Sequence, residues 1–205
     1  MNAVISLIAM TSISFGQHPN TWHELTLGAS SPDDAVSILG RPTKDKGDQK
    51  LYADIGNWVD KKARYRKLEF HKLEGMKKVN LYFREKALAA IELELEEKVN
   101  PNSLGEAYGV DFIPKIGSLA KAADPSTFER QNGRTFPKRY PLTYNLVAVS
   151  DNAFVVAQVQ QGVFAEFGKS MAGAEDEEMS FPGSVWKIQL IARGEQDRKG
   201  LDALK

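Results

Sequence analysis

The chain has 205 residues, of which 42% are hydrophobic and 26% are charged, so it can bury a core in one or two domains. Lysine plus arginine and aspartate plus glutamate each number 27, and this zero net charge creates no overall field that would attract nucleic acid or an anionic membrane. Cysteine is absent, which excludes disulfides, thiolate metal sites, cysteine nucleophiles and a lipid-modified N-terminal cysteine.

Residues 1–17 have the character of a secretory signal peptide. They contain no charged side chain, and an apolar run from Ala3 to Met10 precedes small residues through Gly16. This pattern predicts an exported protein, periplasmic or secreted, with cleavage near Gly16–His18. A basic residue before the apolar run and a clear A-x-A site are both missing, so a first buried strand is the alternative interpretation. The run is shorter than the roughly 20 residues that a transmembrane helix needs.

The stretch SPDDAVSILG, residues 31–40, predicts a short capped helix. Ser31 can accept a backbone N–H of the first turn, Pro32 suits the first helical position, and Asp34 occupies the capping-box position. Gly40 can adopt the left-handed conformation that ends a helix. A helix of two turns is not stable alone, so it must dock on another element. We expect the docking face to consist of Ala35, Ile38 and Leu39.

Alternating apolar residues predict antiparallel strands after this helix. In the clearest case, Ile91, Leu93 and Leu95 alternate with glutamates, and this period of two outweighs the helix-favouring residue types. The predicted strands of this half are Lys50–Ile55, Tyr65–Leu73, Met76–Arg84 and Ala89–Glu96.

The helix motif then returns as NPNSLGEAYG. Asn100 and Pro101 stand where the first copy has its cap and its proline, and Gly109 stands in the place of Gly40. Asp151-Asn152 predicts a hairpin turn in the second half. The predicted strands of this half are Tyr140–Ser150, Asn152–Gln160 and Ser184–Arg193, with Val163–Phe167 as a further candidate.

We therefore predict an α+β fold made of two tandem repeats, each a short helical segment followed by an antiparallel β-meander. The first repeat covers residues 18–99 and the second covers residues 100–193. A polar insertion at about residues 114–138 interrupts the second repeat, and residues 194–205 form a charged tail.

This arrangement resembles the β-lactamase-inhibitor-protein-like (BLIP-like) fold, which occurs in tandem in the inhibitors and singly in small outer-membrane assembly lipoproteins of the BamE/SmpA type. The resemblance rests on TLGASSPDDAVSILGRP, VNLYFREKALAAIEL and VNPNSLGEAYGVDF, and it covers roughly residues 21–193. It implies a fold and a binding role, and no catalytic residues. The lipoproteins carry a lipidated cysteine that this chain lacks, and no residue here matches an inhibitory loop.

Common catalytic and metal-binding motifs are missing from the sequence. The segment GVFAEFGKS has five residues between its glycines where a phosphate-binding loop has four, so we interpret it as a strand that ends in a loop. His18, His23 and His71 lack metal-ligand spacing, and no G-x-S-x-G elbow occurs. We therefore expect no metal site, no cofactor and no enzymatic activity.

Two charge runs and one tryptophan are candidates for binding. The basic run KKARYRK, residues 61–67, can contact a polyanion or a membrane surface, although a solvated loop or strand edge is the alternative interpretation. The acidic run AEDEEM lacks the oxygen pattern of a calcium loop. Trp58, in the polar stretch GNWVDKK, is the best candidate for an exposed anchor in a protein interface. The candidate partner-binding residues are Trp58, Lys61, Lys62, Arg64, Tyr65 and Arg66.

The sequence thus predicts an exported, non-enzymatic binding or scaffold module that recognises a protein partner in the cell envelope and no nucleic acid. Two alternatives remain open. One is an envelope hydrolase that uses two carboxylates in a cleft. The other is peripheral binding of lipid or a polyanion through Lys61–Lys67, with weak contact to a membrane surface.

Overall fold

The computed structural model describes residues 18–52, 62–115, 128–131, 134–137, 143–160, 181 and 183–195. The predictions for residues 1–17, Trp58, Lys61 and Val163–Phe167 fall outside these stretches. The same holds for the acidic run and for the tail beyond residue 195.

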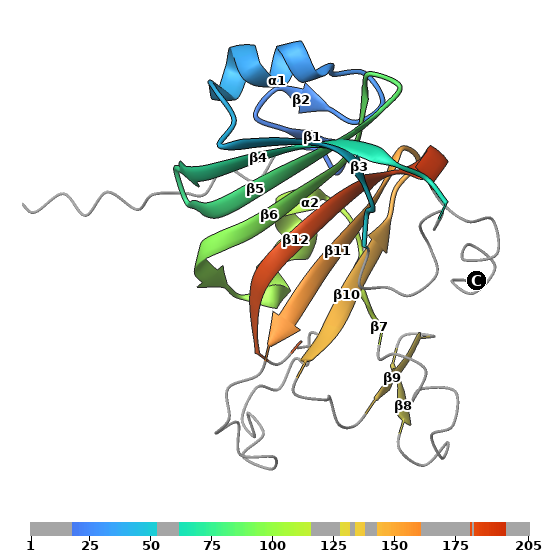
Figure 1. Ribbon diagram of the computed structural model, residues 1–205. Coiled ribbons are helices and arrows are strands. Elements are labelled where there is room, and N and C mark those ends of the chain that lie inside the picture. The colour runs from blue at the N-terminus through green and yellow to red at the C-terminus, as the bar shows by residue number, and fades with distance from the viewer. Residues whose placement is uncertain are drawn as a thin grey trace, which may run out of the picture.

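One antiparallel sheet of eight strands dominates the fold, in the order β3-β4-β5-β6-β12-β11-β10-β7 (Figure 1). Strands β3 to β6 follow one another from one edge, and β7, β10, β11 and β12 follow one another from the other edge, so β6 and β12 pair in the middle. The sheet and its short helices confirm the α+β class in a sheet-dominated form. The strands are β3 (Lys44–Gln49), β4 (Tyr65–Leu73), β5 (Met76–Arg84), β6 (Ala87–Val99), β7 (Ile113–Lys115), β10 (Thr143–Val149), β11 (Ala153–Gln160) and β12 (Ser184–Ala192).

Small elements accompany the sheet. A hairpin of β8 and β9 lies within the predicted polar insertion. The small elements are β1 (Thr21–Trp22), β2 (Leu25–Thr26), α1 (Pro32–Leu39), the 3-10 turn η1 (Pro101–Ser103), α2 (Leu104–Tyr108), β8 (Phe128–Gln131), β9 (Arg134–Pro137) and the 3-10 turn η4 (Arg193–Glu195).

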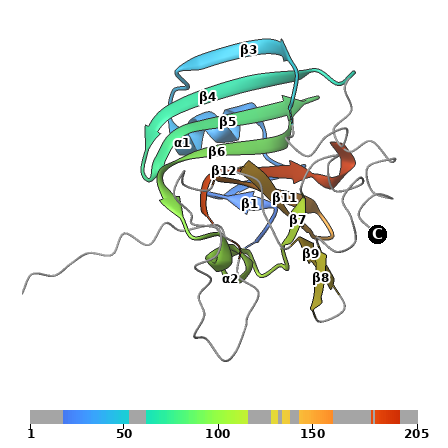
Figure 2. The ribbon, with the colours of Figure 1, turned by 90° about the horizontal axis from the view of Figure 1, so that it is seen from below.

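The helices and the β1–β2 hairpin cover one side of the sheet, which we call the inner face. Their buried residues Trp22, Leu25, Ala35, Leu104 and Tyr108 share one hydrophobic cluster with the strands. In the view from below (Figure 2), α1, β1 and α2 lie along the same side of the sheet. The strands contribute every second residue to this cluster, as their alternation predicts. These residues include Leu68, Phe70, Val79, Leu81, Ile91, Leu93, Leu95, Val155, Ala157, Ile188 and Leu190.

The first helix is capped as the sequence predicts. Ser31 accepts a hydrogen bond from the backbone N–H of Asp34 at 3.2 Å, and the Asp34 carboxylate accepts one from the backbone N–H of Ser31 at 2.7 Å. Gly40 has a φ of 82° and donates its N–H to the carbonyl of Val36. The predicted docking face is wrong at Ile38, which is 40% exposed. Pro32, Ala35 and Leu39 form the docking face instead, because their spacing places them on one side of the helix.

The second helical segment is also capped at both ends, with a different geometry. The Asn100 side chain accepts a hydrogen bond from the backbone N–H of Asn102 at 3.0 Å, and Pro101 is buried. Gly109 ends α2 with a φ of 63° and donates its N–H to the carbonyl of Gly105. The Asn102 side chain also bonds the backbone N–H of Phe181 at 2.6 Å and so fixes a distant segment to the helix.

Most predicted strands are confirmed, and one is wrong. β4 and β5 have the predicted bounds, β6 is longer than predicted, and β10, β11 and β12 lie within the predicted ranges. The strand predicted at Lys50–Ile55 is displaced, because the observed strand is Lys44–Gln49 and the described residues Leu51 and Tyr52 lie outside it. β3 is an edge strand with charged residues on both faces, so it has no alternating apolar pattern that could reveal it.

Candidate binding surface

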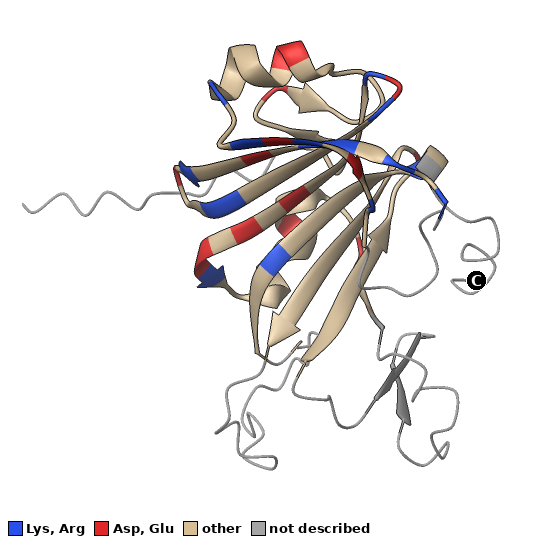
Figure 3. Cartoon of the chain, viewed as in Figure 1, with Lys and Arg blue, Asp and Glu red and all other residues tan. Residues whose placement is uncertain are grey.

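The side of the sheet opposite the helices, which we call the outer face, is half polar and half apolar. Bands of charge cross β4, β5, β6 and β12 in Figure 3, whereas β10 and β11 carry none. The strand registers place the outward side chains in rows across the sheet. The middle row consists of Lys44, Glu69, Asn80, Glu92, Gln189, Val156 and Val147. The two flanking rows consist of His71, Lys78, Glu94, Lys187, Gln158 and Asn145, and of Lys46, Lys67, Tyr82, Ala90, Ile191 and Phe154.

The centre of the middle row is held by Glu92, which lies between Asn80 and Gln189. Its carboxylate accepts hydrogen bonds from Asn80 Nδ2 at 2.6 Å and from Gln189 Nε2 at 2.8 Å. Lys187 Nζ lies 3.0 Å from the same carboxylate. Burial raises the pKa of Glu92, but the charge of Lys187 and these hydrogen bonds outweigh it, so the net pKa lies below its ordinary value. We call Glu69, Asn80, Glu92 and Gln189 the polar row.

Glu69 forms the other anionic centre of the polar row. Its Oε1 lies 2.7 Å from His71 Nε2 and 3.1 Å from Lys44 Nζ, while its Oε2 lies 3.7 Å from Lys67 Nζ. The hydrogen bond with His71 and the contact with Lys44 lower the pKa of Glu69 to about 2. Glu69 is therefore ionised at neutral pH, and its charge is shared by Lys44 and Lys67.

Glu94 and Lys67 of the outer face also have charged or aromatic partners. Glu94 contacts Lys77 Nζ at 2.8 Å and Lys78 Nζ at 3.2 Å, and these hydrogen bonds hold its pKa below the ordinary value. Lys67 Nζ lies 5.6 Å from the centre of the Tyr82 ring, which is a cation–π distance. Burial lowers the pKa of Lys67 and raises the pKa of Tyr82. The polar half thus carries a network of charged and polar side chains, most of which contact a partner on a neighbouring strand.

The apolar half of the outer face meets the connection between β3 and β4. Leu51 and Ala63, near the two ends of that connection, belong to a cluster with Phe154 and Ile191. The backbone carbonyl of Tyr52 accepts a hydrogen bond from Gln189 Nε2 at 2.9 Å. The Tyr52 side chain is 71% exposed, so an accessible aromatic ring stands beside the polar row.

The structure separates the residues of the predicted basic run. Tyr65 is buried against Tyr82 on the outer face, with the ring centres 6.3 Å apart, so it is not an exposed contact. Arg66 points to the other face and bonds Asp45 through two nitrogens at 3.0 and 2.7 Å. Lys62 and Arg64 are exposed, and Arg64 donates to backbone carbonyls nearby. The described part of the run is therefore not one basic surface, because strand alternation divides it between two faces.

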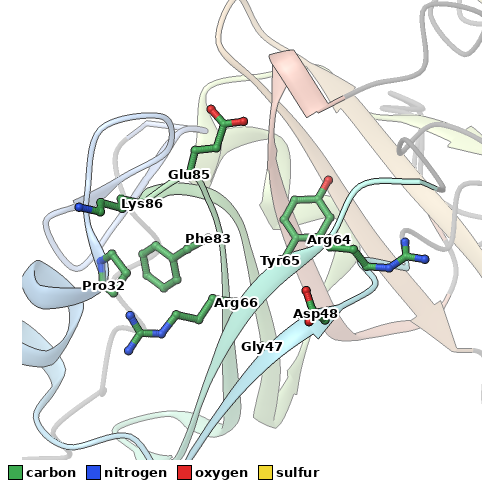
Figure 4. A pocket seen from close by; sticks show the side chains of 9 residues that line it. All are labelled: Pro32, Gly47, Asp48, Arg64, Tyr65, Arg66, Phe83, Glu85 and Lys86. Atoms are coloured by element: carbon green, nitrogen blue, oxygen red, sulfur yellow. The ribbon is translucent and has the colours of Figure 1, made fainter.

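Arg64, Tyr65 and Arg66 do line a shared pocket of about 280 Å³ at the sheet edge (Figure 4). Its remaining lining residues are Pro32, Gly47, Asp48, Phe83, Glu85 and Lys86. Figure 4 shows Lys86 and Arg64 directed away from each other, so these cations do not converge on one point. The pocket offers no focused anion site.

Comparisons of the chain with protein-family models, curated proteins and solved structures find no match. Within the part of the chain that the structure describes, no group of three or more His, Cys, Asp or Glu side chains is placed to hold a metal ion. None of the described helices is long and apolar enough to cross a membrane.

Sequence reasoning overlooked the polar row. It placed Glu92 and Glu94 on the outward side of their strand, which the register confirms, but assigned them no role. It did not single out Asn80, Lys187 or Gln189. The sequence does contain a polar residue at every second position of these strands. Recognising the row also requires the register between β6 and β12, which are far apart in the sequence.

Proposed function

We propose that the protein is a non-enzymatic binding module that recognises a protein partner through the outer face of its sheet. The polar row carries this proposal, because its cross-strand bonds hold charged groups in fixed positions beside the exposed ring of Tyr52. A binding surface that is ordered before the partner arrives loses less conformational entropy on binding. Asn80 and Gln189 of the row are buried, and the accessible groups beside it are Lys44 and His71, which contact Glu69 and have side chains that are 52% and 39% exposed.

The ionisation of the outer-face glutamates favours binding over the hydrolase alternative. A carboxyl group that acts as a general acid must hold its proton near neutral pH, which needs a raised pKa. The pKa values of Glu69, Glu92 and Glu94 are instead lowered by their hydrogen bonds and lysine partners. These three groups are suited to charge recognition and unsuited to proton donation.

We also infer that the two halves of the chain are tandem repeats of the BLIP-like type. Each helical segment begins with a proline after a side-chain cap and ends at a glycine with positive φ. Each is followed by four strands of the sheet in chain order, and the last strands of the two sets pair with each other. This arrangement supports a pseudo-twofold axis between β6 and β12.

We further propose that the protein acts after export, in the periplasm or outside the cell, because of the uncharged apolar run in residues 1–17. Intact-mass analysis of the chain recovered from cell fractions tests this. A mature form that begins near His18 in the exported fraction supports export, and a full-length chain confined to the cytoplasm contradicts it.

Site-specific photo-crosslinking tests the binding role. The photoreactive amino acid replaces Tyr52 or Lys78 on the outer face, or Val36 on α1 as a matched exposed control. We expect the same protein, identified by mass spectrometry, to be captured in the envelope fraction from both outer-face positions and not from Val36. Capture from Val36 alone would place the interface on the helix side and contradict the proposal.

A further inference from the structure

The polar half of the outer face carries a surplus of positive charge. Each of its glutamates is already engaged by lysine, and Glu69 is shared by Lys44, Lys67 and His71. The described residues of its three rows contribute five lysines and three glutamates, a surplus of two charges. They are Lys44, Lys46, Lys67, Lys78 and Lys187, with Glu69, Glu92 and Glu94.

The surplus is concentrated where β3 pairs with β4. Lys46 lies directly opposite Lys67 in the register, and like charges in this position destabilise a strand pair. Lys46 has no ion-pair or hydrogen-bond partner among the described residues. Lys67 Nζ lies 3.7 Å from Glu69, a carboxylate that already has two closer partners, Lys44 and His71. Asp45, the acid between Lys44 and Lys46, is bound to Arg66 on the opposite face and cannot compensate this pair.

We propose that Lys44, Lys46 and Lys67, which we call the basic patch, bind the carboxylates of an acidic segment of a partner protein. This inference rests on the proposed function and names the chemistry of the partner at that surface. Separate carboxylates can approach the lysines one at a time, and two of them balance the surplus. A phosphate-dense lipid surface or a polyphosphate would bring further negative charge against Glu69 and Glu92 on the same face.

The test measures binding of the full chain to fluorescent poly-L-glutamate by anisotropy at low and moderate salt. Lys46→Glu removes a cation and supplies an internal carboxylate opposite Lys67, so we expect affinity to fall about tenfold while thermal stability is kept or raised. Lys98→Glu, at the far end of β6, changes the net charge equally and is the control, with an expected change below about twofold. Vesicles of phosphatidylglycerol and inorganic polyphosphate serve as competing probes.

Each outcome decides between the possibilities. Selective loss of poly-glutamate binding in Lys46→Glu supports the basic patch. Equal loss in both variants, or binding to vesicles or polyphosphate without binding to poly-glutamate, overturns it. If crosslinking from Tyr52 persists in Lys46→Glu while poly-glutamate does not bind the unmodified chain, the proposed function stands and the acidic-partner inference fails.

Discussion

Removal of the Glu92 carboxylate tests whether the polar row stabilises the sheet as well as presenting charge. In Glu92→Ala, Asn80 Nδ2, Gln189 Nε2 and Lys187 Nζ lose an acceptor that now lies 2.6, 2.8 and 3.0 Å away. Hydrogen bonds to a charged group contribute about 1.5–3 kcal/mol each, and the desolvation of Glu92 offsets part of their sum. Because the Lys187 charge stays largely buried after this carboxylate is removed, we expect a loss of about 3–5 kcal/mol in the free energy of unfolding.

Urea denaturation followed by tryptophan fluorescence measures this loss, with the slope m used to check that both variants unfold in the same way. Glu92→Gln keeps one acceptor oxygen, so we expect a smaller loss of about 1.5–3 kcal/mol. Glu97→Ala, at an exposed position of the same strand, is the control and should stay within about 0.5 kcal/mol. A loss below about 1 kcal/mol in Glu92→Ala at unchanged m would refute a structural role for the row.

The unmodified chain and Glu92→Gln, compared at several pH values, test the ionisation of Glu92. Its pKa in the folded chain lies below the ordinary value of 4.5, so the carboxylate stabilises the fold fully above that value and loses its contribution as the pH falls through the folded pKa. Gln has no such titration. The stability difference between the unmodified chain and Glu92→Gln should therefore be largest above about pH 5 and shrink in acid. A difference that grows as the pH falls would contradict the assigned direction.

Further expectations concern the helix caps and an exposed ion pair, all measured by urea denaturation. Ser31→Ala removes the acceptor of the Asp34 N–H and should cost about 1 kcal/mol. Gly40→Ala should cost more than Gly109→Ala, because φ 82° with ψ −163° is essentially open to glycine alone, whereas φ 63° with ψ 33° is a left-handed region that other residues reach at about 1–2 kcal/mol. Asp45→Asn should cost less than about 1 kcal/mol and nothing at high salt, because both partners of that pair are half exposed.

Period-two patterns predicted most of the sheet because one face of each central strand is buried. Tyr65–Leu73 and Met76–Arg84 have matching bounds for this reason, since a slip by one residue would move the whole apolar set to solvent. The bounds of α1 could also be predicted, because the hydrogen bonds of Ser31 and Gly40 are made with residues of the helix itself and depend on no distant contact. Local rules thus suffice where the energy is local or the pattern is strictly periodic.

The remaining parts depend on contacts that a single strand does not encode. β3 was displaced in the prediction because an edge strand with Lys44, Asp45 and Lys46 has no buried face. Ile38 was placed in the helix stripe because its apolar character was read without the position of the docking surface. The polar row was not predicted, because Glu92 and Gln189 come together only through the pairing of β6 with β12, which are separated by nearly half of the chain.

The two halves of the outer face differ in how far other parts of the chain cover them, and this difference bears on which half a partner could contact. Leu51 and Ala63 already pack on the apolar half, next to residues such as Phe154, so that area is used by the fold itself. Among the described residues, no hydrophobic cluster of this kind lies on the polar half, and the Lys44 and His71 side chains are partly exposed there. A hydrophobic partner would have to displace Leu51 and Ala63, whereas a partner that contacts Lys44 and His71 leaves these two residues in place. Under the proposed binding role, recognition by charge at the polar half therefore has the lower conformational cost.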